Sequence, residues 1–340
     1  ANGGQGLSAI PTYAETIDTT TPIYRHPTNR QMIGFLSRAA RKSVARGINQ
    51  KLRYAQWFLA WRFAKPFSVG RDGKPDWRDF QLIKPPSGRF YADPFLWRIH
   101  GESHLFFEDF SIAEGRARIS LMTLSEDGAW SQPRPALDRG YHTSYPFLIE
   151  RNGEIFMIPE TAARNRVEIY RAVQFPDRWE LVDVRLEGSR AVDTTVLQHA
   201  NRTWIFTNIG EPGASTHDEL QLFHADDLFD EWAPHPATPI VSDVRRARMA
   251  GAIFETDGRL IRPSQDCSVR YGYALTFNAI RELSPTKYVE EPITTLTPDW
   301  LKGNLGTHTW NSDGFIDVVD AQRQVVKPAT HLMRKILTTR

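Results

Sequence analysis

Alternating apolar and polar positions recur along most of the chain as paired short runs joined by a polar turn. One pair reads YADPFLWRIHGESHLFFEDF from Tyr91, and similar pairs start at Ser144, Val192, Ala250 and Gly306. Each pair predicts two strands, because alternate residues of a strand face opposite sides of a sheet. The intervening turns HGES, RNGE, HANR, TDGR and NSDG are typical of β-hairpins.

These hairpins return about every 50 residues, which indicates an internal structural repeat. The stretches between them, such as ARISLMTLSEDGAW and VEIYRAVQFPDRWELV, predict a further strand pair in each repeat. Each unit therefore holds about four strands, as one blade of a β-propeller does. A β-sandwich with irregular strand spacing is the alternative.

The fifth unit lacks its outer half, since little strand pattern follows Ala321. The missing half is present at the other end of the chain, within about residues 55–84. We therefore predict an all-β fold, a five-bladed β-propeller whose ring is closed by N-terminal strands, which removes exposed sheet edges. The predicted domains are an N-terminal extension (1–50), the propeller (51–325) and a basic C-terminal tail (326–340).

Residues 31–49 predict a short basic helix within the extension. Its apolar residues near one face are Met32, Ile33, Leu36, Ala40 and Val44. From Arg25 to Lys65 the sequence has ten Lys or Arg residues and no Asp or Glu. Such a helix either packs against the propeller with a solvated face, or lies at an anionic membrane surface or beside a neighbouring catalytic domain.

Composition limits the partners, the metal sites and the cellular location that can be expected for this fold. The chain has 340 residues, of which 41% are apolar and 24% charged, as in folded soluble proteins. Its net charge of +2 gives no reason to expect a nucleic-acid partner. A single cysteine, Cys267, excludes an internal disulfide and a cysteine-based zinc site. With no apolar run of membrane-spanning length and no signal-peptide pattern at the start, we expect a cytoplasmic protein, peripheral if the helix binds a membrane.

The ends of each hairpin carry the polar groups of interest. A hairpin returns the chain to its starting rim, and the first strand of a propeller blade lines the central channel. Five blades therefore aim these end groups into one cup. The end groups pair as Asp93 with Glu108 or Asp109, Tyr145 with Glu160, Asp193 with Asn208, Gly251 with Asp266, and His308 with Asp317 or Asp320. Glu108 and Asp109 are adjacent and point opposite ways on a strand, so we expect at most one of them to face the channel.

A cup of carboxylates suits a carbohydrate ligand. Acids at close quarters can divide the roles of proton donor, base and charge stabiliser at a glycosidic bond, because burial and like charges separate their pKa values. Aromatic side chains could stack on sugar faces, and basic ones could bind hydroxyls or a phosphate. The candidates for these contacts are Tyr91, Tyr145, Tyr271, Trp310, His142, Arg248 and Arg262.

Three of the candidate residues at the hairpin ends also have a purely structural interpretation. Asp93 precedes a proline and could cap a turn. Glu160 could be a salt-bridged acid at the rim, and His308 a hydrogen-bonded histidine of an inner strand.

The motifs YADPF, VDTT and GTH resemble those of five-bladed glycoside hydrolases of the arabinanase and β-xylosidase type. The resemblance implies that Asp93 is a general base, that Asp193 orients the site, and that His308 lies near the axis by a metal ion. That family's general acid is a Glu of the fourth blade, and RRARMAGAIF has none. The acid would then be Glu160, Glu108 or Asp109. A divalent cation on the axis stays open, because the residues show no fixed ligand spacing.

A longer series of motifs, from YADPF through FFEDF and GEIFMIPET to RPSQDCSVRYG, is similar to the propeller domain of the glucosamine inositolphosphorylceramide transferase family and its bacterial relatives. This resemblance covers about residues 50–325 and implies a glycan or glycolipid context. We expect an enzyme that transfers or hydrolyses a sugar, with Asp93, Asp193 and Glu160 as catalytic residues. The expected substrate-binding residues are Glu108, Asp109, His142, Tyr145, Arg262, Asp266, His308 and Trp310. The alternative is a non-catalytic glycan-binding module that positions an acceptor for a partner catalytic domain.

Overall fold

The computed structural model describes residues 28–70, 73, 75–125, 128–211 and 213–326. The chain divides into two units, Ala1–Leu52 and Arg53–Arg340, and each is described by itself. The loop expected over residues 1–27 and the basic tail expected after residue 326 lie outside the described residues.

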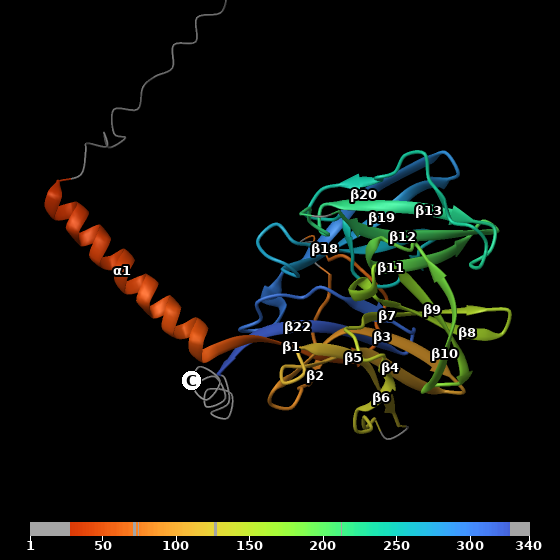
Figure 1. The fold of residues 1–340 in the computed structure, drawn as a ribbon, viewed down its shortest axis with the longest axis horizontal. Helices are drawn as coiled ribbons and strands as arrows, with labels where there is room; N and C mark the ends of the chain where they lie inside the picture. The colour runs from red at the N-terminus through yellow and green to blue at the C-terminus, as the bar shows by residue number, and fades with distance from the viewer. Residues whose placement is uncertain (1–27, 71–72, 74, 126–127, 212, 327–340) are drawn as a thin grey trace, which may run out of the picture. The chain divides into compact units, whose positions relative to one another are not determined.

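The first unit contains helix α1 (Asn29–Leu52), which starts two residues before the predicted span (Figure 1). The reason is a capping box. Gln31 N–H donates to Thr28 Oγ1 over 3.4 Å, while the Thr28 N–H donates back to Gln31 Oε1 over 2.8 Å. No helix in the described part of the chain is long and apolar enough to cross a membrane.

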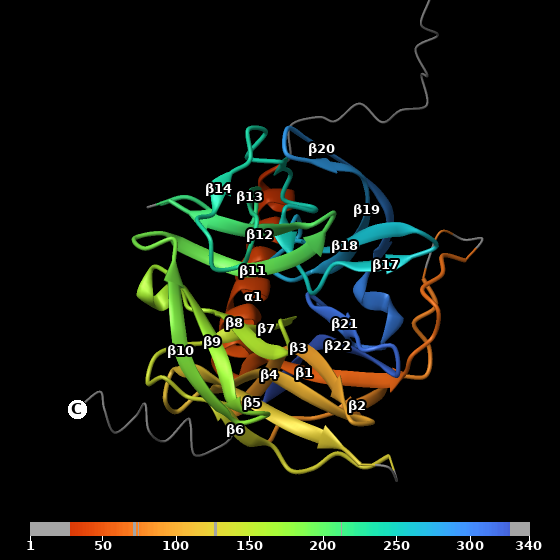
Figure 2. The same ribbon diagram turned by 90° about the vertical axis from the view of Figure 1, so that its right-hand side faces the viewer.

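The second unit consists of five antiparallel sheets around a common centre, which confirms the predicted five-bladed propeller (Figure 2). The first blade contains β3 (Arg89–Ile99), β4 (Glu102–Ser111), β5 (Arg116–Leu124) and β6 (Arg134–Leu137). The second contains β7 (Ser144–Arg151), β8 (Glu154–Glu160), β9 (Val167–Gln174) and β10 (Arg178–Arg185), with a short 3-10 helix, η1 (Ala162–Arg164), after β8.

The third and fourth blades carry extra short strands. The third contains β11 (Arg190–His199), β12 (Arg202–Gly210), β13 (Glu219–Ala225), β14 (Ala233–Pro234) and β15 (Val241–Ser242). The fourth contains β16 (Arg248–Met249), β17 (Phe254–Thr256), β18 (Arg259–Asp266), β19 (Ala274–Ser284) and β20 (Lys287–Leu296), followed by η2 (Pro298–Trp300).

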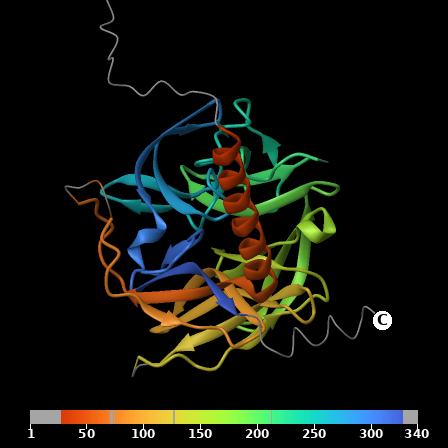
Figure 3. The same cartoon turned by 90° about the vertical axis from the view of Figure 1, so that its left-hand side faces the viewer.

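The fifth blade joins both ends of the propeller sequence. Its strands are β21 (Trp310–Ser312), β22 (Ile316–Val326), β1 (Arg53–Phe63) and β2 (Gln81–Ile83). β1 pairs with β22 along its whole length, from Arg53 opposite Val326 to Phe63 opposite Ile316 (Figure 3). The predicted closure of the ring by N-terminal strands is therefore confirmed.

Local turn chemistry explains the tight hairpins within the blades. A two-residue turn that matches strand twist needs positive φ at both central positions, which Gly and Asn adopt readily. Four of the predicted turns have this geometry, at His100–Gly101, Asn152–Gly153, Ala200–Asn201 and Asp257–Gly258.

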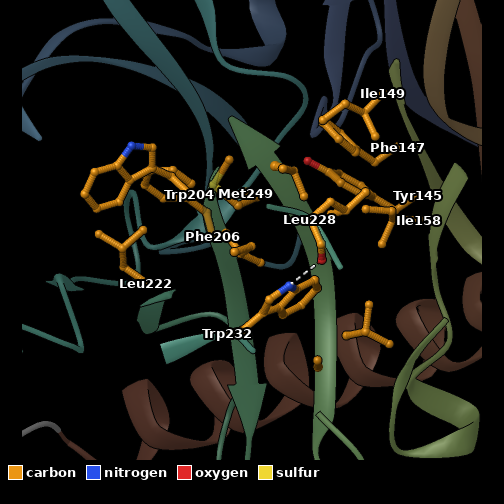
Figure 4. Packing of buried hydrophobic residues seen from close by; sticks show 14 of the residues in the cluster. Tyr145, Phe147, Ile149, Ile158, Trp204, Phe206, Leu222, Leu228, Trp232 and Met249 are labelled. Atoms are coloured by element: carbon orange, nitrogen blue, oxygen red, sulfur yellow. Dashed lines mark hydrogen bonds between the residues drawn. The ribbon is translucent and has the colours of Figure 1, made fainter. Parts of the chain in front are cut away.

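Apolar side chains fill the spaces between neighbouring sheets. In the largest cluster, Trp204 of the third blade packs in one core with Phe147 and Ile158 of the second (Figure 4). The Trp232 indole N–H, also in this core, donates to the Leu228 carbonyl over 2.9 Å. Packing of this kind holds adjacent blades together and leaves their inner ends to form the site.

Candidate functional site

The inner strands of three blades share one backbone irregularity near their first residues. Asp93, Tyr145 and Asp193 have φ values of 49°, 44° and 51°, and each lies at a register shift against the second strand of its blade. Positive φ is uncommon outside glycine, and bulges of this kind redirect a side chain. The fourth blade has Gly251 in this place (φ 131°), where a Cβ would lie 2.0 Å from the Trp310 carbonyl oxygen.

The redirected Asp93 connects three blades. Its carboxylate accepts a 2.8 Å bond from Thr309 Oγ1 of the fifth blade and a 3.3 Å bond from Tyr145 N–H of the second. Its own N–H donates to Asp320 Oδ2 over 3.2 Å. Burial raises the pKa of Asp93 to about 6, although the nearby His308 opposes the change.

His308 lies beside this carboxylate in an enclosed position. Its Nδ1 is 2.5 Å from Asp320 Oδ2 and 3.7 Å from Asp93 Oδ1. The Trp57 ring stacks on the imidazole at 4.0 Å, and a Cβ on Gly272 would meet both rings at 2.9 Å. Burial disfavours the imidazolium, but the Asp320 charge outweighs it, and the pKa of His308 rises above its ordinary value.

A second group of charges forms around Asp193. Its Oδ2 accepts a 2.6 Å bond from Arg248 Nε and a 3.1 Å bond from Gln265 Nε2. Arg248 also reaches Glu160, with 3.5 Å between Nη2 and Oε2, and its guanidinium lies over the half-exposed Tyr271 ring. Burial raises the pKa of Glu160 well above its ordinary value, and the Asp193 charge adds to the effect.

Glu108 completes the acidic side of the cup. His142 Nε2 lies 3.6 Å from Glu108 Oε1, while the Ala117 N–H donates to His142 Nδ1 over 3.1 Å. The neutral ring therefore carries its proton on Nε2, facing Glu108. Burial lowers the pKa of His142. Burial also raises the pKa of Glu108 well above its ordinary value, and the neighbouring carboxylates of Asp93 and Glu160 raise it further.

The structure thus brings Asp93, Asp193, Glu160, Glu108, His142 and His308 together. Asp109 lies on the other face of β4, as strand alternation requires, and accepts a 2.6 Å bond from Arg89 Nε. Tyr145 is fully buried, and its hydroxyl bonds Thr195 Oγ1 at 2.8 Å. Its place at the site is structural, between blades.

Three further predicted residues are occupied elsewhere. Arg262 is buried in a two-bond ion pair with Glu290, both bonds being 2.7 Å. Trp310 packs edge-on against Phe254 in an apolar core, with ring centroids 4.9 Å apart. Asp266 is half-buried at the end of β18 and accepts a 2.9 Å bond from the Ser268 N–H. The structure does not bring these side chains to the acids of the cup.

Residues 82–325 match the family model described as "Glucosamine inositolphosphorylceramide transferase 1, N-terminal". The chain belongs to this family. It is 33% identical over 256 residues to glucosamine inositolphosphorylceramide transferase 1 of Arabidopsis thaliana, covering 69% of this chain and 32% of that protein. The relative of the same name from Oryza sativa subsp. japonica is 30% identical over 252 residues, with 69% and 33% covered. These matches confirm the resemblance read from the motifs. The chain spans about a third of the length of these relatives.

Solved structures of glycoside hydrolases share the fold of this family member. A GH43 β-xylosidase/α-arabinofuranosidase from a compost microbial metagenome superposes with a TM-score of 0.50 at 10% identity, over 71% of this chain and 92% of that one. A family 117 glycoside hydrolase from Zobellia galactanivorans gives a TM-score of 0.48 at 11% identity, over 79% and 90%. At 10% identity the likeness to the GH43 enzyme shows the propeller architecture alone.

Several groups of the cup were not predicted from the sequence. Asp320 was expected only as an alternative to Asp317, which instead pairs with Arg62 at 2.9 Å. Trp57 and Gln265 were not expected at all. Gln265 had one available signal, since it precedes Asp266 at a strand end and therefore faces the other side of the sheet.

The axial residues of this family member could hold a cation. Asp93, His308 and Asp320 each offer one ligand atom, and these atoms lie within 4.8 Å of one another. Two carboxylate oxygens and an imidazole nitrogen form a mixed donor set that suits a divalent metal once His308 is neutral. The residues therefore fit the cation that the hydrolase resemblance implies.

Proposed function

We propose that this propeller is a carbohydrate-active module that acts on a glycosidic bond in its central cup. The observation that carries the proposal is the pair Glu108 and Glu160. Glu108 is buried and Glu160 nearly so, both lie among other carboxylates, and both have pKa values raised well above the ordinary range. A carboxylic acid that keeps its proton beside an ionised partner is what glycosidic bond cleavage requires.

The chemistry is divided by environment. Glu108 or Glu160 donates the proton to the leaving oxygen. Asp93, with a pKa of about 6, is largely ionised at neutral pH and acts as the base. Asp193, paired with Arg248, orients this guanidinium toward Glu160. The proposed mechanism needs no acid from the fourth blade, because the two candidate proton donors, Glu108 and Glu160, come from the first and second blades. Whether water or a sugar hydroxyl accepts the glycosyl group decides between hydrolysis and transfer.

A second candidate is a non-catalytic glycan-binding module that positions an acceptor. It is favoured by the buried state of Asp93 and Asp193, whose carboxylates already accept bonds from protein groups. The relatives are named transferases, and the matched third of their length leaves ample room for a separate catalytic domain.

The decisive experiment is a turnover and binding screen with glycosides, nucleotide sugars and oligosaccharides, followed by mass spectrometry and thermal shift. The variants are Glu108→Gln and Glu160→Gln. Their matched controls are Glu102→Gln and Glu154→Gln, exposed acids on the same two strands. We expect wild type to convert a compound, one of the two cup variants to bind it with turnover lowered about 100-fold, and both controls to behave as wild type. Glycan binding without turnover in wild type supports the second candidate, and no glycan binding overturns both.

We also propose that α1 attaches the protein peripherally to an anionic membrane. Exposed apolar residues gather within one turn of the helix, at Met32, Ile33, Phe35 and Leu36. Arg30 and Arg38 flank them. Co-sedimentation with vesicles containing an anionic lipid should fall several-fold in an Ile33→Ser, Leu36→Ser double variant, whereas neutral vesicles should bind neither protein. Equal sedimentation of both proteins would contradict this proposal.

A further inference from the structure

A groove of about 570 Å³ lies between the first and fifth blades. Its lining includes Lys84, just after β2, and Arg89, Asp109 and Arg118 from β3, β4 and β5. Trp130, from the loop before β6, also lines it. Because Asp109 and Glu108 face opposite sides of β4, this groove is separate from the acids of the cup. Its volume is in the range of small-molecule sites.

The charges of the groove do not balance. Lys84, Arg89 and Arg118 contribute three positive charges to the lining, and Asp109 contributes one negative charge. The carboxylate of Asp109 is fully engaged, since it accepts bonds from Arg89 Nε at 2.6 Å and from Ser120 Oγ at 2.9 Å. Positive charges therefore outnumber negative ones within the lining, although the carboxylates of Glu114 and Asp138 act on Arg89 and Arg118 from outside it.

Two buried donors in the lining lack an acceptor. Among the described residues, neither the Nε–H of Arg118 nor the Nε1–H of Trp130 makes a hydrogen bond. Arg118 Nε lies 3.5 Å from Asp109 Oδ2, close enough for charge attraction but without the alignment of a hydrogen bond. Buried donors are nearly always satisfied in folded proteins, so two unpaired donors beside one cavity point to a ligand that accepts from them once a small side-chain shift opens both nitrogens to the groove.

The donors are held in place before any ligand arrives. The Trp130 ring packs edge-on against Trp61 with centroids 5.6 Å apart. The next residue, Ser131, donates its N–H to the Thr123 carbonyl over 2.9 Å and accepts the Thr123 N–H at 3.0 Å. A rigid donor set loses little freedom when a ligand binds.

We propose that this groove binds a phosphate group of a small ligand or of a lipid headgroup. A phosphate presents several acceptor oxygens around one anionic centre, which suits a lining that offers two guanidinium groups, an ammonium and an indole N–H from different segments of the first and fifth blades. A carboxylate offers acceptors in one plane and would leave some of these donors unpaired. The site is independent of the function proposed for the cup.

The test is calorimetric titration of the full chain with inorganic phosphate and with glucose 1-phosphate. Vesicle flotation forms a second arm, using phosphatidylcholine with and without phosphatidic acid. Arg118→Gln should weaken phosphate binding about tenfold, because it removes a charged donor. Trp130→Phe keeps the ring but removes the N–H, and Lys84→Gln alters an exposed side chain that folding does not need. Each should weaken binding about threefold. Arg259→Gln, an exposed arginine of the fourth blade, is the matched control and should bind as wild type.

The two arms identify the source of the phosphate. Binding of glucose 1-phosphate that the groove variants weaken assigns a soluble phosphate ester. Flotation that the same variants weaken assigns a lipid headgroup. Because α1 is basic and can itself bind anionic vesicles, only the fraction of flotation that is lost in the groove variants is assigned to the groove. The proposal is overturned if phosphate does not bind in either arm, or if it binds equally to wild type and to all three groove variants.

Discussion

Glu108 and Asp109 are adjacent acids on one strand, and the two faces of β4 place them in opposite electrostatic settings. Asp109 faces the interblade groove, where Arg89 and Ser120 donate to its carboxylate. Glu108 faces the cup, where the partially exposed His142 is its nearest basic group at 3.6 Å and other acids surround it. Adjacent residues of one strand therefore differ in environment: the Asp109 carboxylate is neutralised by arginine, whereas the Glu108 carboxyl lies among other acids.

The difference indicates that the two faces of β4 serve different purposes, one stabilising the fold and the other supplying reactive groups. The groove face uses its acid to hold two arginines, which fixes neighbouring strands. The cup face carries acids whose burial is unfavourable in the ionised form, and such sites persist in proteins because the strained groups have a use. Arg248 and His308 are the exceptions inside the cup, since they lie against the carboxylates of Asp193 and Asp320.

The largest effect should come from Arg248→Met. This change leaves the buried Asp193 without its guanidinium partner and leaves Glu160 among acids only. We expect the free energy of unfolding to fall by about 3–5 kcal/mol, as when one partner of a buried ion pair is removed. Urea denaturation measures it, with the exposed Arg259→Met as control. A loss below about 1 kcal/mol would mean that the cup tolerates unpaired acids throughout.

Asp109→Asn should have the next largest effect. The substitution keeps the size of the side chain but removes the charge that holds Arg89 and Arg118 at the groove. We expect the free energy of unfolding to fall by about 2–3 kcal/mol. Urea denaturation at pH 7 measures this loss, and an unchanged value would show that the two faces of β4 do not differ as described.

Glu108→Gln should act in the opposite direction at high pH. A carboxyl whose pKa is raised on folding stabilises the fold fully below its unfolded pKa, and this contribution is lost as pH rises toward the folded pKa. The neutral amide avoids that loss. We expect the variant to be more stable than wild type by about 1 kcal/mol at pH 8, and the gain to shrink toward pH 4.

The smallest effect should come from the control for this pH dependence. Glu102→Gln alters the exposed acid at the other end of β4 and should change the free energy of unfolding by less than about 0.5 kcal/mol at either pH. Thermal unfolding at pH 4, 6 and 8 measures both variants. A pH-independent effect of Glu108→Gln, or a gain as large in Glu102→Gln, would contradict the raised pKa of Glu108.

Much of the propeller could be predicted because its signals are local. Turns such as Asn152–Gly153 need only residues that accept positive φ, and the hairpin spacing then counts the blades. The pairing of Asp93 with Glu108 across one hairpin follows from the same short-range rule. The alternation of strand faces also predicts that Glu108 and Asp109 separate.

Two features of the site could not be predicted in this way: which side chains of an inner strand face the axis, and which contacts join residues far apart in the sequence. Each bulge inserts a residue into the inner strand and reverses which side chains face the axis, so counting alternate positions fails beyond Asp93 or Asp193. Arg262 was expected in the cup as a basic side chain, but it pairs instead with Glu290 of β20, a partner that the hairpin pattern does not reveal. Trp57 reaches His308 only through the closure of the ring, which brings the start of the propeller sequence to its end.

That closure has a consequence for how the protein is made. β1 pairs residue by residue with β22, whose last residue is Val326. During synthesis at the ribosome, β1 emerges early and must wait for almost the whole propeller sequence before its partner exists. Until then its unpaired edge and apolar face are available to chaperones and to other nascent chains. The strand that closes the finished ring is thus also a segment that stays unpaired on one edge through most of synthesis.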